Sequence, residues 1–238
     1  MHCNFLFDLD QTLLNFHASE YKALGIVLRE NELEFNDDIY KAFMAYNKSL
    51  WLELEKKTIT RTELFTKRFN YVLELAGGDL SKLDALKINN DFINTMAVNG
   101  VLMDGALDFV KRLKAEINDC RIYIITNGAT VNAKGQIEST GLNQFIDGLF
   151  VSEDMGVSKP APEYFDIVLK KIDEPKETCI VIGDSLSSDM LGAKNAGLDS
   201  VWFMPVGEDV TGAMQEYEID YTARDFEKLF TVLKAWKE

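Results

Sequence analysis

The sequence predicts an α/β fold in which helices cover both faces of a parallel sheet, with an all-helical module inserted into it. Short runs that are apolar at nearly every position recur through the second half of the chain, separated by helical patterns. Such strands are typical of parallel sheets that are buried on both faces. The interval 15–99 shows helical patterns and no convincing strand. We therefore expect a core formed by residues 1–14 and 100–238 and a separate helical domain at 15–99, sizes that a chain of 238 residues allows.

The sheet is expected to contain one strand near the N-terminus and several in the second half. These segments are Phe5–Phe7, Arg121–Thr126, Leu149–Val151, Thr178–Ile182 and Ser200–Phe203. Apolar residues at helical spacing lie between and after them, at Leu107–Leu113, Tyr164–Ile172, Met190–Ala196 and Phe226–Trp236. Gly197 ends the third of these helices in the usual way.

The inserted interval contains several amphipathic patterns. Apolar residues mark one helix over Tyr21–Leu28 and a second over Ile39–Leu54. Thr60-Arg61-Thr62-Glu63 is a capping box that opens a third. Gly77-Gly78 then breaks the chain before a further series of leucines.

Charge and cysteine usage narrow the possible partners. The 25 basic and 39 acidic residues give a net charge of −14, which repels nucleic acid and anionic membranes, so neither partner is expected. Cys3, Cys120 and Cys179 fall in or beside expected strands, and we interpret them as buried apolar residues rather than a disulfide or zinc site. No signal peptide and no membrane-spanning run is recognised, which makes a cytoplasmic location the default expectation.

Two carboxylates, Asp8 and Asp10, directly follow the apolar run Phe5–Phe7. Unpaired, they would repel each other and resist burial, whereas a divalent cation removes both objections. Asp8 could then attack an electrophile such as phosphorus, and Asp10 could act as general acid and base. An Asp-x-Asp pair on its own is more often a loop or a helix cap.

Two further motifs supply groups that suit a phosphate. Thr126 and Asn127 follow the strand that begins at Arg121, and their side chains with nearby backbone N–H groups could cradle a phosphate. Lys159 lies in a loop before Pro160 and could neutralise the phosphoryl group and the aspartates. We expect Thr126 and Lys159 to be catalytic as well as phosphate-binding. Taken singly, the first motif is more often a turn and the second a solvated surface lysine.

A last acidic pair follows the strand Thr178–Ile182. Asp184 could complete an oxygen cage for Mg²⁺. Asp189 could hold a water molecule beside the metal or orient Lys159, although a carboxylate at a helix N-terminus is an equally good interpretation. Three of these motifs directly follow buried strands, whose carboxyl ends form one crevice in an open parallel sheet, so we expect the groups to converge.

Together these motifs resemble those of the haloacid dehalogenase-like hydrolase superfamily. The matching segments are Phe7–Leu13, Ile125–Gly128, Ser158–Pro160, and Val181–Ser185 with Asp189. The resemblance implies a Rossmann-like core, a turn and flap after Asp8, and a helical cap at the insertion site. It also implies that Mg²⁺ is held by Asp8, the backbone carbonyl of Asp10, and Asp184.

The resemblance also carries information on substrate. Superfamily members similar to dehalogenases lack the second aspartate, so the presence of Asp10 favours phosphate esters. Several segments resemble the bacterial house-cleaning 5′-nucleotidases, which act on nucleoside monophosphates: Asn47–Trp51, Thr58–Thr60, Arg68-Phe69, Ser152–Pro160 and Ser188–Gly197. One departure is Met103-Asp104-Gly105, where the superfamily usually has proline before the glycine. We expect Asp104 to serve there as a helix N-cap without functional consequence.

We therefore expect a Mg²⁺-dependent phosphomonoesterase that forms a phospho-aspartate at Asp8 and hydrolyses nucleoside 5′-monophosphates. Another small phosphomonoester, such as a sugar phosphate or phosphoglycolate, a phosphomutase reaction, and a non-catalytic binding protein stay open as alternatives. Aromatic residues of the insertion could stack on a base, but their helical spacing favours a role in its own core: Tyr21, Phe43, Tyr46 and Trp51. Asn15 and His17 are interpreted as a polar linker.

Overall fold

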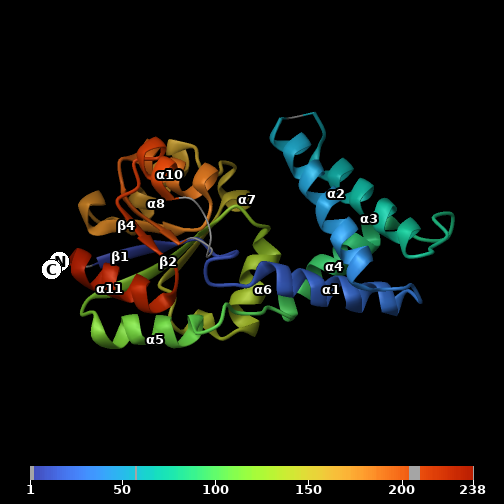
Figure 1. Cartoon of the computed structure of the whole chain (residues 1–238), viewed down its shortest axis with the longest axis horizontal. Coiled ribbons are helices and arrows are strands. Elements are labelled where there is room, and N and C mark those ends of the chain that lie inside the picture. Colours follow the sequence, from blue (N-terminus) through green and yellow to red (C-terminus); the bar gives the residue numbers. More distant parts are fainter. Residues whose placement is uncertain (1–2, 57, 204–209, 238) are drawn as a thin grey trace. The chain divides into compact units, whose positions relative to one another are not determined.

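The computed structural model describes residues 3–56, 58–203 and 210–237. The chain divides into two compact units, a core unit of Met1–Phe16 with Gly100–Glu238 and a helical unit of His17–Asn99 (Figure 1). Each is described by itself. The assignment of 15–99 as a separate cap domain stays a prediction.

The core unit is built on a parallel sheet with the strand order β3-β2-β1-β4-β5-β6. Its strands are β1 (Cys3–Phe7), β2 (Cys120–Thr126), β3 (Gly148–Val151), β4 (Cys179–Gly183), β5 (Asp199–Phe203) and β6 (Tyr221–Ala223). The predicted α/β class and parallel sheet are confirmed. Our interpretation missed β6, because its three residues include an exposed Tyr221 and carry no apolar run.

Helices cover both faces of this sheet (Figure 1). Alternate β1 residues face opposite layers, since Phe5 and Phe7 belong to one apolar cluster and Leu6 to the other. The first cluster includes residues of α5 (Ala106–Glu116), α6 (Thr130–Ser139) and α11 (Phe226–Lys237). The second includes residues of α8 (Pro162–Ile172), α9 (Leu191–Ala196) and α10 (Val210–Glu216).

The strand order places a topological switch point beside β1. The chain runs from β1 outward to β2 and β3, and then returns to the other side of β1 to form β4, β5 and β6. Phe7 is paired with Ile124 of β2 and with Ile182 of β4, so Asp8 emerges between the carboxyl ends of both strands. Ligands of open α/β sheets bind at such a point.

The chain leaves and re-enters the core unit through two adjacent segments. The N–H of Asn15 donates to the carbonyl of Val101 at 2.8 Å, and the N–H of Met103 donates to the carbonyl of Leu13 at 2.9 Å. These bonds flank an antiparallel bridge between residues 14 and 102. They form a two-stranded ribbon at the base of the insertion.

The expectation that Asp104 caps the following helix is wrong. Helix α5 begins at Ala106, and its N-cap residue is Gly105, with no side-chain cap hydrogen bond. Gly105 has a φ of 82°, a left-handed conformation that suits glycine, so the helix starts one residue later than we expected.

The helical unit contains α1 (Phe16–Glu30), α2 (Asp37–Glu55), α3 (Arg61–Leu75) and α4 (Ala85–Val98). The predicted capping box is present, since Thr60 Oγ1 accepts from the N–H of Glu63 at 3.2 Å and Glu63 Oε2 accepts from the N–H of Thr60 at 2.7 Å. Phe43 is fully buried, with its ring 6.0 Å from those of Phe69 and Phe92. Phe43 therefore serves the core of this unit.

The other aromatic residues named for the insertion are less deeply placed. Tyr21 is 38% exposed and packs against the rings of Phe35 and Tyr40. Tyr46 lies against Tyr71 at a centroid distance of 4.5 Å. Trp51 is partly exposed.

A buried arginine lies among the helices of this unit. The guanidinium of Arg68 donates to Asn89 Oδ1 through Nε at 2.9 Å and Nη2 at 2.6 Å, and through Nη1 to Asn47 Oδ1 at 3.3 Å. Burial lowers its pKa to about 10, an effect that the charge of Glu20 opposes. Arg68 therefore cross-links three helices through two asparagine acceptors.

The three cysteines are buried, as expected, and their thiols are not joined in a disulfide. Each occupies the first position of its strand, at the opposite end of the sheet from Asp8. Within the described ranges, no helix has the length and apolar character required to cross a membrane.

Candidate active site

Lys159 lies at the centre of the predicted site. Its ammonium Nζ donates to Asp8 Oδ1 at 2.6 Å, to Asp189 Oδ1 at 2.6 Å and to the carbonyl of Ile125 at 2.9 Å. The Lys159 side chain is 1% exposed. The structure thus joins groups from β1, β2, the loop before α8 and the segment after β4 around one buried cation.

Asp10 lies beside this cluster with an oxygen that lacks a partner. Its Oδ1 atom is buried, and no hydrogen bond to it is found among the described residues. A Cβ atom added to Gly128 would lie 3.5 Å from Asp10 Oδ2, so the turn after β2 approaches this carboxyl closely. Thr12 Oγ1 donates to Asp8 Oδ2 at 3.4 Å, which places a buried hydroxyl on the oxygen that Lys159 does not hold.

Thr126 and Asn127 occupy the end of β2. The Thr126 side chain is buried, and its Oγ1 accepts from the N–H of Gly128 at 3.0 Å. Asn127 Oδ1 accepts from the N–H of Lys159 at 3.0 Å, while its Nδ2 donates to the Lys159 carbonyl at 2.9 Å. The Asn127 amide therefore holds the backbone of Lys159, and a phosphate-binding role for both side chains stays a prediction.

Asp184 and Asp189 follow β4. Asp189 is fully buried; its Oδ1 accepts from Lys159, and its Oδ2 accepts from the N–H of Ser185 at 3.1 Å. Asp189 does lie in a helical turn, η3 (Leu186–Met190), but its carboxylate is also bound to Lys159. A Cβ atom added to Gly183 would lie 2.3 Å from Asp189 Oδ2, so glycine is required for this approach.

The electrostatics of the site reflect crowded carboxylates in a buried setting. Burial raises the pKa of Asp8 well above its usual range, although Lys159 opposes the rise. Burial raises the pKa of Asp10 to about 6, and burial with the charge of Asp189 raises that of Asp184 to about 7. Burial would lower the pKa of Lys159, but the carboxylates of Asp189 and Asp8 outweigh it and raise the pKa. The lysine therefore stays protonated, and the acids favour an additional positive charge.

The donor set fits a hard divalent cation. Carboxylate oxygens of Asp8, Asp184 and Asp189 all lie within 4.8 Å of one another. Mg²⁺ prefers a few carboxylate and carbonyl oxygens. Both oxygens of Asp189 accept firm hydrogen bonds, at 2.6 Å from Lys159 and 3.1 Å from the N–H of Ser185, whereas Asp8 Oδ2 has only the long 3.4 Å contact with Thr12. Asp8 and Asp184 are therefore the better candidates for direct ligands.

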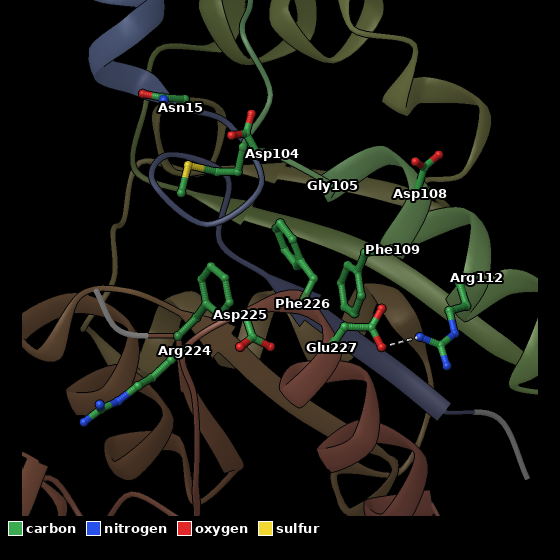
Figure 2. Close-up of a pocket in the computed structure, with 12 residues that line it drawn as sticks. Asn15, Asp104, Gly105, Asp108, Phe109, Arg112, Arg224, Asp225, Phe226 and Glu227 are labelled. Atoms are coloured by element: carbon green, nitrogen blue, oxygen red, sulfur yellow. Dashed lines mark hydrogen bonds and ion pairs between the residues drawn. The ribbon is translucent and has the colours of Figure 1, made fainter. Parts of the chain in front are cut away.

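A separate cavity of about 620 Å³ lies in the core unit beside α5 and α11 (Figure 2). The rings of Phe109 and Phe226 stack on one side of it at a centroid distance of 4.8 Å, and Arg112 pairs with Glu227 at 2.8 Å. None of the predicted site residues lines this cavity. The predicted site is defined instead by the converging charges around Lys159.

The model of the haloacid dehalogenase-like hydrolase family matches residues 4–197. The chain belongs to this family. The predicted family membership and the prediction that the chain is a hydrolase are thereby confirmed. The matched range contains every residue that the sequence assigned to the site.

Relatives within the haloacid dehalogenase-like hydrolases align over nearly the whole chain. HAD-hydrolase YfnB of Bacillus subtilis is 31% identical over 229 residues, covering 96% of this chain and 94% of YfnB. A crystal structure of YfnB bound to magnesium superimposes with a TM-score of 0.85 over 98% of both chains. Pyrimidine 5′-nucleotidase PynA of Streptococcus pneumoniae is 32% identical over 92% of this chain and 91% of its own length. Pyrimidine 5′-nucleotidase YjjG of Escherichia coli is 30% identical over 82% and 83%.

Several contacts of this hydrolase site were not foreseen from the sequence. Gly183 admits Asp189, Thr12 approaches Asp8, and the indole Nε1 of Trp202 donates to the carbonyl of Asp184 at 2.8 Å. Thr12 and Gly183 stand inside recognisable motifs, so their positions offered a signal. Trp202 sits in an apolar strand, where the pattern indicates only burial.

Proposed function

We propose that this chain is a Mg²⁺-dependent phosphomonoesterase that works through a phospho-aspartate on Asp8 and hydrolyses nucleoside 5′-monophosphates. The observation that carries the proposal is the ion-paired cluster of Lys159 with Asp8 and Asp189, next to Asp184. A phosphoryl group needs a nucleophile, a proton donor and positive charge in one place. This cluster supplies the nucleophile and the positive charge, and Asp10 beside it is the candidate proton donor.

In the first half-reaction Asp8 attacks phosphorus, and the bond from phosphorus to the leaving oxygen breaks. Lys159, which holds Asp8 Oδ1, leaves the second carboxylate oxygen for the attack or for a cation. Asp10 gives its proton to the leaving oxygen, a role that suits a partly buried carboxyl whose Oδ1 has no hydrogen-bond partner among the described residues. The charge of Lys159 offsets the negative charge that gathers on the phosphoryl oxygens.

In the second half-reaction Asp10 takes a proton from a water molecule, which attacks the phospho-aspartate and releases phosphate from Asp8. Thr126 and the backbone N–H groups at the end of β2 would bind the phosphoryl oxygens in both steps. Mg²⁺, held by Asp8, the Asp10 carbonyl and Asp184, would supply charge neutralisation for the attacking carboxylate and the phosphoryl group.

The choice of nucleotides rests on the relatives. PynA and YjjG carry the name pyrimidine 5′-nucleotidase, and both align over most of this chain at 30% identity or more. More distant relatives are named as phosphatases of other small phosphate esters, such as the ribulose-1,5-bisphosphate 5-phosphatase of Halopiger xanaduensis at 28% identity. We therefore propose a pyrimidine nucleoside 5′-monophosphate as the preferred substrate.

Phosphate release from a panel of phosphomonoesters tests this proposal. The panel contains UMP, CMP, TMP, AMP, GMP, ribose 5-phosphate, glyceraldehyde 3-phosphate and phosphoglycolate, each assayed with Mg²⁺ and with EDTA. We expect the highest kcat/KM for a pyrimidine monophosphate and no turnover in EDTA. A sugar phosphate as best substrate would refute the nucleotide assignment and leave the chemistry intact.

The variant Asp8→Asn tests the nucleophile. It should abolish turnover of every substrate, while circular dichroism and the melting temperature indicate a folded protein. If the purified variant hydrolysed its substrates at the wild-type rate, a phospho-aspartate on Asp8 would be excluded. Asp166→Asn, on the exposed side of α8, is the matched control and should keep full activity.

A further inference from the structure

The peptide group that joins Asp184 to Ser185 is held from both ends. Its carbonyl accepts from the indole Nε1 of Trp202 at 2.8 Å, and its N–H donates to Asp189 Oδ2 at 3.1 Å. Asp189 in turn accepts from Lys159 at 2.6 Å. A continuous set of hydrogen bonds therefore runs from Trp202 to the central lysine through the backbone beside Asp184.

Trp202 is well placed to act as a fixed donor. It lies in β5 beside Gly183 of β4, and the two residues are paired in the sheet register. The side chain packs in the apolar layer that contains Val181, and the residue is only 3% exposed. Strand pairing and close packing thus restrict the indole to one orientation, with its N–H directed at the Asp184 carbonyl.

Holding this carbonyl restrains the backbone from which the Asp184 carboxylate projects. The peptide plane determines the backbone angle ψ of Asp184, and therefore the direction of its Cβ relative to the segment that carries Asp189. Without the indole N–H, a partly buried carbonyl would lack its donor and the peptide could rotate. Partners of this kind, which hold a metal ligand without touching the metal, tune metal affinity in other proteins.

We propose that Trp202 is a positioning residue of the metal site: its indole N–H holds the Asp184–Ser185 peptide so that the Asp184 carboxylate faces the cation. This inference rests on the proposed function, which assigns Asp184 to Mg²⁺. Trp202 itself touches neither the substrate nor the metal. Its effect is on affinity for Mg²⁺, not on the chemical steps at Asp8 and Asp10.

Two substitutions remove the donor in different ways. Trp202→Phe removes the N–H and part of the ring volume. Trp202→benzothienylalanine, introduced by amber suppression, replaces the N–H by sulfur and keeps the shape of the bicyclic ring. Trp236→Phe is the matched control, because Trp236 Nε1 also donates to an acidic residue, Asp199, at 2.7 Å but lies away from the site.

Titration calorimetry of the full chain with MgCl₂, without substrate, gives the Kd of each protein. We expect both Trp202 variants to bind Mg²⁺ about 10-fold more weakly than the wild type, and Trp236→Phe to bind it equally well. Kinetics should show the same shift in the Mg²⁺ concentration needed for half-maximal rate. At saturating Mg²⁺, kcat and the substrate KM should return to within about twofold of wild type, which a general loss of structure would not allow.

The outcomes separate this inference from the proposed function. Wild-type Mg²⁺ affinity in the benzothienylalanine variant would overturn the role of the N–H, whatever Trp202→Phe does, and would leave the phosphatase proposal untouched. If Trp202→Phe does not fold, the benzothienylalanine variant alone decides. A wild-type chain that binds no Mg²⁺ would overturn both proposals together.

Discussion

Replacing Lys159 by methionine would remove the ammonium group between two buried carboxylates. Lys159 Nζ lies 2.6 Å from Asp8 and 2.6 Å from Asp189, and the lysine and Asp189 side chains are each 1% exposed. Methionine has a similar length and no charge, so the two acids would face each other without compensation. Removing one partner of a buried ion pair costs about 3–5 kcal/mol, because the other charge stays buried and unpaired.

In a chain of this length each kcal/mol shifts the melting temperature by roughly 2–4 °C. We therefore expect Lys159→Met to lower Tm by roughly 10 °C in a buffer with EDTA, where no divalent cation replaces the lost charge. Differential scanning calorimetry measures this shift. The double variant Lys159→Met/Asp189→Asn should melt at a higher temperature than Lys159→Met, because one of the two unpaired charges is gone.

Lys134→Met provides the control for Lys159→Met. Lys134 is 59% exposed and lies 3.9 Å from Asp154, and exposed pairs contribute about 0–1 kcal/mol. A Lys159→Met protein that melts within 2 °C of this control would refute the reasoning. The reasoning would also be refuted if adding Asp189→Asn to Lys159→Met lowered Tm further. That result would mean that the Asp189 carboxylate does not destabilise the protein once the lysine is lost.

Two other substitutions test tight contacts elsewhere. Gly183→Ala would force Asp189 away from its place, and it should lower the free energy of unfolding by about 1–3 kcal/mol in urea and remove most of the phosphatase activity. Gly212→Ala, in the open surface of α10, is the control and should be neutral or slightly stabilising in the same assays. Equal behaviour of the two variants would contradict the steric argument. Arg68→Leu would leave two buried asparagine oxygens without donors and should lower the free energy of unfolding by about 2–4 kcal/mol. Lys67→Met, at an exposed lysine, is the control and should lower it by less than about 1 kcal/mol. A near-equal effect of the two variants would count against a structural role for the buried guanidinium.

The elements that leave an apolar run could be predicted from the sequence, including the short strand β3, and β6 could not. β1, β2, β4 and β5 are buried over nearly all their positions, so each leaves a continuous apolar run. β6 has only three residues at the edge of the sheet, and its pattern cannot be distinguished from a loop. The start of α5 was misplaced because Asp104 is a favourable cap residue, whereas the backbone turn that selects Gly105 depends on tertiary structure.

The charged groups of the site could be named from the sequence because each is required for chemistry and stands in a motif. What those groups contact could not be derived in the same way. The pairing of the Asn127 amide with the Lys159 backbone joins residues 32 positions apart. The Trp202 contact joins a strand residue to a neighbouring loop. Such contacts depend on the register of β4 with β5 and on loop geometry, which periodicity does not specify.

The ribbon at the base of the insertion has a consequence for engineering. Because Asn15 and Val101 are hydrogen-bonded neighbours, the intervening segment starts and finishes at nearly the same point in space. A turn of two to four residues could bridge these positions, as in an ordinary hairpin. Excision of the insertion, or its exchange for that of another relative, would therefore leave the strand connectivity of the remaining polypeptide unbroken.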